Sequence, residues 1–200
     1  MRINLRAYAR AVIRALFIVL LACVACAPPA ARLSGTELGA KDAPDFTLTD
    51  GISGQTVTLS SLRGNVVALA FLYTRCPDVC PITAAQFRAA QRSLGPDAPR
   101  VRFVAVSVDP EGDTPAAVRA FSNERDLREN WRYLIGSRAQ LQIVWAAYGI
   151  ASFPAPSGVG VAHNDAIFVI DQKGRERELL HSDVVLNDLV ADLRLLMNER

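Results

Sequence analysis

The stretch that decides the fold covers residues 66–85 and reads VVALAFLYTRCPDVCPITAA. Residues 66–73 form an uninterrupted apolar run, which is typical of a strand buried on both faces of a sheet. Two cysteines, Cys76 and Cys80, follow directly, and Pro81 fits the first turn of a helix. The stretch therefore predicts a buried strand that leads into a cysteine loop, with a helix that begins at Pro81 and ends near residue 94.

The two cysteines lie at the start of a predicted helix, a position that favours reactive or metal-binding thiols. Cys80 is predicted at or near the helix N-cap, where unpaired N–H groups and the helix dipole favour a thiolate. Pro77 disfavours a helical backbone at Cys76, so the two sulfurs can face each other across a short turn. A structural disulfide is the ordinary interpretation of paired cysteines in an exported protein. The flanking prolines and the strand-to-helix position favour a metal or redox site instead.

The rest of the body alternates strands and helices. Strands are predicted at 101–108 and 166–171 and at the sheet edge near 176–180, after an N-terminal hairpin formed by 43–48 and 55–59. Helices are predicted over 115–125, 138–148 and 183–198, the first capped by Asp113 or Thr114 and the second by Ser137. This order predicts one α/β domain over residues 42–200, with a central mixed sheet flanked by helices.

Composition and charge narrow the class of partner. Half of the 200 residues are hydrophobic, which is enough for a sizeable core. The net charge is only +2, and four arginines lie in residues 1–22, so the remainder holds 18 basic and 20 acidic side chains. Nucleic acid is therefore not an expected partner, because neutralising phosphates requires clustered Lys and Arg.

The N-terminal residues 1–26 have the layout of an export signal or membrane anchor. Spaced arginines precede an apolar run of about 13 residues, which is shorter than a comfortable membrane span. Residues 20–23, LLAC, resemble a bacterial lipobox and predict lipidation of Cys23, with Cys26 as a second candidate. An uncleaved anchor and soluble export are the alternatives. Each places the body outside the cytoplasm, and a lipid or an anchor holds it at the periplasmic face of the membrane, behind a flexible tether over 27–41.

The cysteine loop resembles that of the Sco/SenC family of copper proteins for cytochrome oxidase assembly. The family's Thr-x-Cys-Pro-Asp-x-Cys-Pro signature is matched by Thr74, Cys76, Pro77, Asp78, Cys80 and Pro81. The resemblance continues through VSVDP at 106–110 and DTP at 113–115, and ends at His163 and the following IFVIDQKG. It implies a thioredoxin-like fold and a copper ion bound by Cys76, Cys80 and His163.

The chemistry of these side chains agrees with the resemblance. Two thiolates and one imidazole form a soft set of ligands suited to Cu(I), and with a weak extra ligand to Cu(II). His163 could instead be a hydrogen-bonded structural histidine. Asp78 is expected to form the turn or to support the ligands by hydrogen bonds, and His181 is expected at the surface.

The leading hypothesis is a metallochaperone that delivers copper to the dinuclear copper site of cytochrome c oxidase and keeps the cysteines of that subunit reduced. Other periplasmic copper chaperones or thiol reductants are possible further partners. The rival hypothesis is a thiol–disulfide oxidoreductase of thioredoxin type that cycles Cys76 and Cys80. Thioredoxins carry a proline before the corresponding strand, whereas residues 162–165 read AHND. A peroxidase or redox sensor would need a peroxide-binding arginine, for which Arg75 is the nearby candidate.

Overall fold

The computed structural model describes residues 32–127, 129–154 and 160–199. Contacts divide the chain into two units, Met1–Arg32 and Leu33–Arg200, and all described residues except Arg32 belong to the second. The export signal predicted over residues 1–26, with Cys23 and Cys26, lies outside the described residues, as do residues 27–31 of the predicted tether. Among the described residues, no helix combines the length and apolarity that crossing a bilayer requires.

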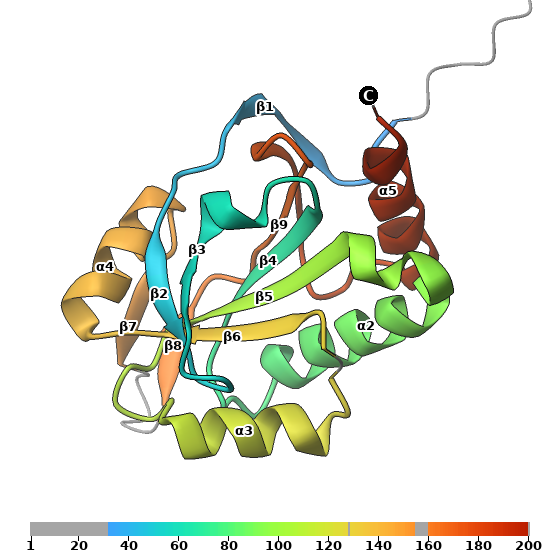
Figure 1. The fold of residues 1–200 in the computed structure, drawn as a ribbon. Coiled ribbons are helices and arrows are strands. Elements are labelled where there is room, and N and C mark those ends of the chain that lie inside the picture. Colours follow the sequence, from blue (N-terminus) through green and yellow to red (C-terminus); the bar gives the residue numbers. More distant parts are fainter. Residues whose placement is uncertain (1–31, 128, 155–159, 200) are drawn as a thin grey trace, which may run out of the picture. The chain divides into compact units, whose positions relative to one another are not determined.

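A mixed sheet forms the centre of the second unit (Figure 1). In spatial order its strands are β1 (Thr36–Asp42), β10 (Arg175–Leu180), β9 (Ile167–Ile170), β4 (Val66–Leu72), β5 (Val101–Ser107), β6 (Trp131–Ile135), β2 (Thr47–Asp50) and β3 (Thr56–Thr58). The strands β4, β5 and β6 are parallel to one another, and the other neighbours are antiparallel. The mixed α/β architecture predicted from the sequence is confirmed.

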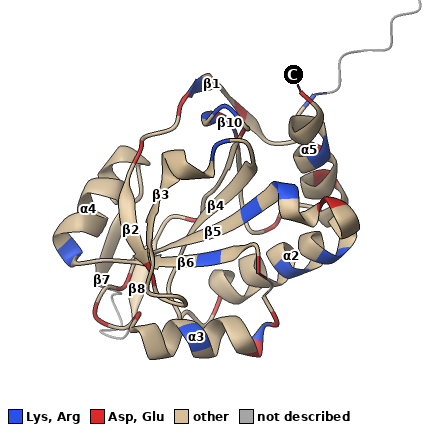
Figure 2. Ribbon diagram, viewed as in Figure 1, with Lys and Arg blue, Asp and Glu red and all other residues tan. Residues whose placement is uncertain are grey.

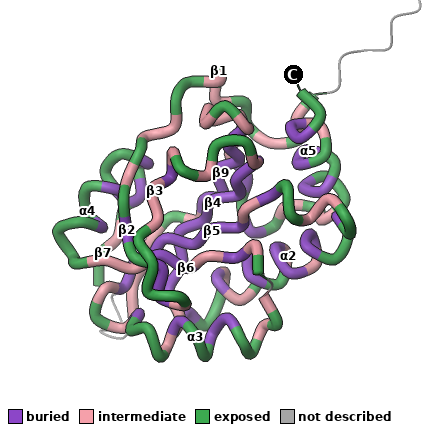
Figure 3. Tube along the Cα trace, viewed as in Figure 1, coloured by how far each residue is buried: buried purple, intermediate pink, exposed green. Residues whose placement is uncertain are grey.

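The central strand β4 follows directly from its sequence. All seven of its residues are buried, and Figure 3 shows its neighbours β5 and β6 as mostly buried strands with some half-buried positions. A strand that pairs on both sides and is covered on both faces has no position where a polar side chain meets water. Figure 2 accordingly shows no charged residue along β4.

Four helices are described in the second unit: α2 (Val79–Leu94), α3 (Pro115–Glu124), α4 (Arg138–Ala147) and α5 (Leu186–Asn198). Short 3₁₀ turns cover Leu59–Leu62 and Gly95–Arg100. The predicted caps are confirmed, because the side chains of Thr114 and Ser137 accept from the backbone N–H groups of Ala117 and Gln140.

Aromatic contacts show how the helices cover the sheet. On one face, Phe87 of α2 contacts Trp131 of β6, and Phe121 of α3 contacts the next inward residue of the same strand, Tyr133. On the other face, Tyr148 at the end of α4 packs against Phe71 of β4 and Phe168 of β9. The helix α5 packs beside α2 and against β4, and Tyr148 covers the opposite face of that strand.

The structure adds strands that the sequence pattern did not predict. The C-terminal end of the expected tether is a strand, β1, which pairs with β10, so the strand predicted at the edge is not the outermost one. The sequence of β1, TELGAKD, has a single large apolar residue, and its pairing is interrupted near Gly39 and Ala40, which have φ of 75° and 58°. Such a strand lacks the period-two pattern that identifies strands in a sequence. The strand β6 was also missed.

A two-stranded sheet, β7 (Ser152–Pro154) and β8 (Val161–His163), stands apart from the main sheet. The sequence predicted a loop over 153–160, and residues 155–159 of that loop lie outside the described residues. Ser152 pairs with His163 and Pro154 with Val161. This hairpin carries His163 on the connection between α4 and β9.

Candidate metal centre

The strand β4 and the helix α2 position the two cysteines. Cys76 lies in the loop after β4 and is 8 % exposed, whereas Cys80 lies in the first turn of α2 and is fully buried. Both are free thiols. The helix begins at Val79 rather than at the predicted Pro81, so Cys80 is inside the helix and Asp78 occupies the cap position. Pro81 is compatible with this start, because the first N–H groups of a helix have no partner within it.

The sequence suggested a thiolate at Cys80, but in the structure Cys76 is the cysteine whose pKa is lowered. The Cys80 thiol donates a hydrogen bond to the Cys76 sulfur, and the backbone N–H groups of Asp78 and Cys80 add to it, so the pKa of Cys76 is lowered to about 5 despite partial burial. The same bond, together with burial, raises the pKa of Cys80 far above its ordinary value. In the metal-free protein the pair therefore holds one proton and one negative charge at neutral pH.

The hairpin β7–β8 brings His163 to the cysteines. Its Nε2 lies 3.9 Å from Sγ of Cys80, and its Nδ1 lies 3.0 Å from the carbonyl oxygen of Asn164. A carbonyl only accepts, so Nδ1 donates to it, and Nε2 is the ring nitrogen that faces the cysteines. The ring of Tyr73 stands edge-on to the imidazole at 5.9 Å between centroids.

The separation of sulfur and nitrogen suits a shared soft metal. Bonds of about 2.3 Å to sulfur and about 2.0 Å to nitrogen place two ligands of one ion roughly 3.5–4 Å apart. Cys80 and His163 already meet that distance. In the described part of the chain, no three His, Cys, Asp or Glu side chains are gathered closely enough to hold a metal as they stand. A metal bound by Cys76 as well would therefore draw the cysteine loop and the hairpin slightly together.

Asn164 fixes the hairpin, a role that no sequence pattern predicted. Its side-chain oxygen accepts from the backbone N–H of Ala151 at 2.8 Å, and its amide donates to the carbonyl of Gly149 at 3.3 Å. These bonds tie the end of β8 to the chain that follows α4. They hold the residue next to His163, and so they hold the direction of the imidazole.

Asp113 anchors the cysteine loop to the neighbouring strands of the sheet. It is 2 % exposed, and its carboxylate accepts from both the backbone N–H and the hydroxyl of Thr74, each at 2.8 Å. The hydroxyls of Ser107 and Tyr133 donate to it at 2.6 and 3.0 Å. The sequence suggested a helix cap for Asp113, but Thr114 makes that cap, and Asp113 instead joins the loop to β5 and β6.

Arg75 turns away from the thiols. Its guanidinium pairs with the buried carboxylate of Asp109 at 2.7 Å and lies over Gly112, where a Cβ atom would collide with it. The candidate peroxide-binding arginine is therefore engaged in holding the loop to the end of β5.

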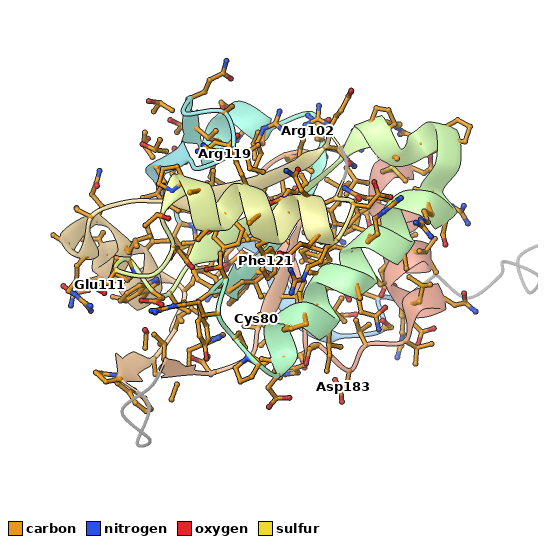
Figure 4. The ribbon with its side chains drawn as sticks, turned by 90° about the horizontal axis from the view of Figure 1, so that it is seen from below. Cys80, Arg102, Glu111, Arg119, Phe121 and Asp183 are labelled. Carbon is orange, nitrogen blue, oxygen red and sulfur yellow. The ribbon has the colours of Figure 1, made fainter. Side chains whose placement is uncertain are left out.

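The remaining residues singled out in the sequence lie at the surface. Asp78 is exposed, and its backbone N–H, not its carboxylate, faces the Cys76 sulfur. His181 is exposed, and its Nδ1 bonds the carbonyl of Asp165 at 2.8 Å. Figure 4 shows Cys80 at the N-terminal end of α2.

A dithiol at the junction of a central strand and a helix, faced by an imidazole from the opposite loop, defines a thioredoxin-like protein with a soft-metal or redox site. The comparisons with known proteins agree. The chain belongs to the SCO1/SenC family, whose model matches residues 35–198.

Relatives are found among both sequences and solved structures. The chain is 30 % identical over 150 residues to the SCO1 protein homolog of Bacillus subtilis, which covers 70 % of this chain and 76 % of that protein. The structure of Bradyrhizobium japonicum ScoI with copper bound matches with a TM-score of 0.70 and 31 % identity, over 78 % of this chain and 99 % of that one. A SCO1/SenC family lipoprotein from Bacillus anthracis matches with a TM-score of 0.72 and 25 % identity, over 82 % and 99 %.

Proposed function

We propose that this protein binds one copper ion through Cys76, Cys80 and His163 and delivers it to the dinuclear copper site of cytochrome c oxidase. One observation carries the proposal: Nε2 of His163 faces the cysteines and lies 3.9 Å from Sγ of Cys80, beside the Cys76 thiolate. The copper-bound state of the Bradyrhizobium protein, 31 % identical, supports the choice of metal.

The three side chains differ in how they would hold the ion. Cys76 offers a thiolate at neutral pH, whereas Cys80 has to release its proton when the metal binds, so uptake releases a proton to solvent. The two sulfurs would suffice for Cu(I), which accepts few soft ligands. The imidazole would matter most for Cu(II).

The position of the site supports transfer rather than storage. The loop residues Pro77 and Asp78 and the adjacent Ile82 are exposed, and His163 is half-buried. Competing ligands of a client subunit could therefore approach the copper from the side of the loop. The same dithiol could reduce a client disulfide: as the bond between Cys76 and Cys80 forms, the pair gives up two electrons and its one proton, and the client sulfurs take up the electrons together with protons from the pair and from solvent.

We also propose that the N-terminus holds the domain at the periplasmic face of the cytoplasmic membrane, with lipid on Cys23. The lipobox-like sequence LLAC at 20–23 and the description of the Bacillus anthracis relative as a lipoprotein support this placement. Membrane-bound copper chaperones or thiol reductants of the same compartment would be its further partners.

The test separates copper transfer from thiol exchange. His163→Ala should lose cytochrome oxidase assembly and Cu(II) binding but keep a reducible cysteine pair, because exchange requires a thiolate and not an imidazole. Oxidase activity is measured in cells at matched protein level and limiting copper, with His181→Ala as the control that should match the wild type. The purified reduced chain should bind about one copper, and its oxidised form none.

A second function has one observation in its favour. The Cys76 thiolate in contact with the Cys80 thiol is the arrangement of a thiol–disulfide oxidoreductase. If His163→Ala supports normal oxidase activity while Cys76→Ser does not, the histidine is structural and the oxidoreductase is the correct function.

A further inference from the structure

A pair of buried carboxyl groups lies far along the chain from the cysteines. Glu178 of β10 is fully buried and Asp192 of α5 is 3 % exposed, and their side chains contact each other. Neither takes part in the proposed copper site. Buried carboxylates normally require a counter-charge or a full set of donors, so their contact has to be explained.

The donors to the pair come from the N-terminal arm, defined as residues 33–42. The backbone N–H of Ser34 donates to both carboxylate oxygens of Asp192 at 3.3 and 3.2 Å, and the Ser34 hydroxyl donates to one of them. The backbone N–H of Gly35 donates to Oε2 of Glu178 at 3.0 Å. The arm packs tightly here, because a Cβ on Gly35 would lie 2.6 Å from the carbonyl oxygen of Leu179.

One oxygen of the pair is left over. Oε1 of Glu178 is buried and has no hydrogen-bond partner among the described residues. The cationic side chain of the preceding residue, Arg177, donates to Glu199 and Asp171 instead. An orphaned oxygen beside a second carboxylate is satisfied if it carries a proton and donates it to that carboxylate.

We propose that Glu178 and Asp192 share one proton and that this shared proton latches the N-terminal arm onto β10 and α5. When the proton leaves to solvent, both carboxylates are negatively charged and repel each other in a buried site. Opening the arm admits water, which solvates the two charges and reduces the repulsion. The latch joins the start of the arm, at Ser34 and Gly35, to α5 and β10. It is independent of copper.

The direction of the pH dependence follows from the environment. Burial, and then the charge of Asp192, raise the pKa of Glu178 to about 7, whereas in the open arm it would return towards 4.5. A raised carboxyl pKa stabilises the closed state fully below the open-state value and loses that stabilisation as pH rises to the closed-state value. The arm should therefore be tightest in acid and should loosen between about pH 4.5 and 7.

Other charged groups near the arm have to be separated from the pair. They are Glu37 and Lys41 on β1, Glu176 and Arg177 on β10, and Asp188 on α5. Glu37 is the best control, because it is exposed and lies directly opposite Glu178 in the register of β1 and β10.

The test is amide hydrogen exchange of residues 34–42 in the full chain, corrected for the intrinsic pH dependence of exchange. Protection of the wild-type arm should fall by about tenfold or more from pH 5 to pH 7, while protection of α2 stays constant. Glu178→Gln should hold its protection across this range, because its amide replaces the shared proton as donor to Asp192. Glu37→Gln should fall like the wild type.

Two results would overturn the latch: constant protection in the wild type, or a fall in Glu178→Gln equal to that of the wild type. If Glu178→Gln does not fold, Asp192→Asn serves the same purpose, since its amide donates to Glu178 and removes the like charge. A pH-dependent fall that persists in Asp192→Asn would also refute the shared proton.

Discussion

At the scale of single residues, the cysteine loop depends on a carboxylate that is not a ligand. Asp113 receives four hydrogen bonds, two from the half-buried Thr74 and two from the buried hydroxyls of Ser107 and Tyr133. Removing an acceptor of this kind leaves several buried donors without a partner. A buried donor left without a partner lowers the stability of the fold by more than its hydrogen bond had contributed.

Asp113→Ala should therefore destabilise the fold by about 3 kcal/mol and loosen the cysteine loop. Urea unfolding of the variant and of the wild type measures the difference. Asp97→Ala is the matched control: Asp97 pairs with Arg100 at the surface, and its loss should change stability by about 0.5 kcal/mol or less. Equal stability of Asp113→Ala and the control would show that the network contributes nothing.

The candidate ligands Cys76, Cys80 and His163 were predictable from the sequence, because two cysteines in a strand-to-helix loop form a recognisable local motif. Asp113 and Asn164 were not assigned their roles, because the partners that define them lie elsewhere in the chain. Thr74 is 39 residues from Asp113, and Gly149 is 15 residues from Asn164. Only the fold brings such groups together.

At the scale of elements, the hairpin β7–β8 determines where the imidazole lies. It forms a sheet of its own, and the bonds of Asn164 to Ala151 and Gly149 connect its end to the chain after α4. Positioning of this kind governs how well a histidine binds a metal.

Asn164→Ala should weaken Cu(II) binding about 10- to 100-fold by freeing the hairpin, while leaving the reactivity of Cys76 unchanged. Copper titration and thiol alkylation of the same sample report the two effects separately. Asn123→Ala, an exposed asparagine on α3, should match the wild type in both. A loss of thiol reactivity equal to the loss of copper binding would place the effect in the cysteine loop instead.

Helices and strands were predictable from the sequence where their burial produces a clear pattern of apolar residues. The strand β4 is covered on both faces and therefore reads as a continuous apolar run. The strand β6 has five residues, WRYLI, between charged residues and a helix cap, which is too short for a clear pattern. The strand β1 is polar because its faces are mostly exposed, so its pairing depends on backbone bonds to β10 that a side-chain pattern does not record.

At the scale of the whole domain, β1 is the outermost strand on the side of β10. A strand that lies outside another occupies its free N–H and C=O groups, which would otherwise offer pairing to a second molecule. The charged and polar residues of β1, and the turn of its backbone at Gly39 and Ala40, make it a poor template for such pairing.

This has a practical consequence for anyone shortening the chain. A soluble form cut at residue 43, where the sequence pattern begins its first strand, removes β1 and uncovers β10. It should self-associate, whereas a form that starts at Leu33 should stay monomeric, as judged by light scattering during gel filtration. If both forms are monomeric, β1 is dispensable as a cover. The residues that look like a spacer therefore belong to the folded domain, and a truncation has to keep them.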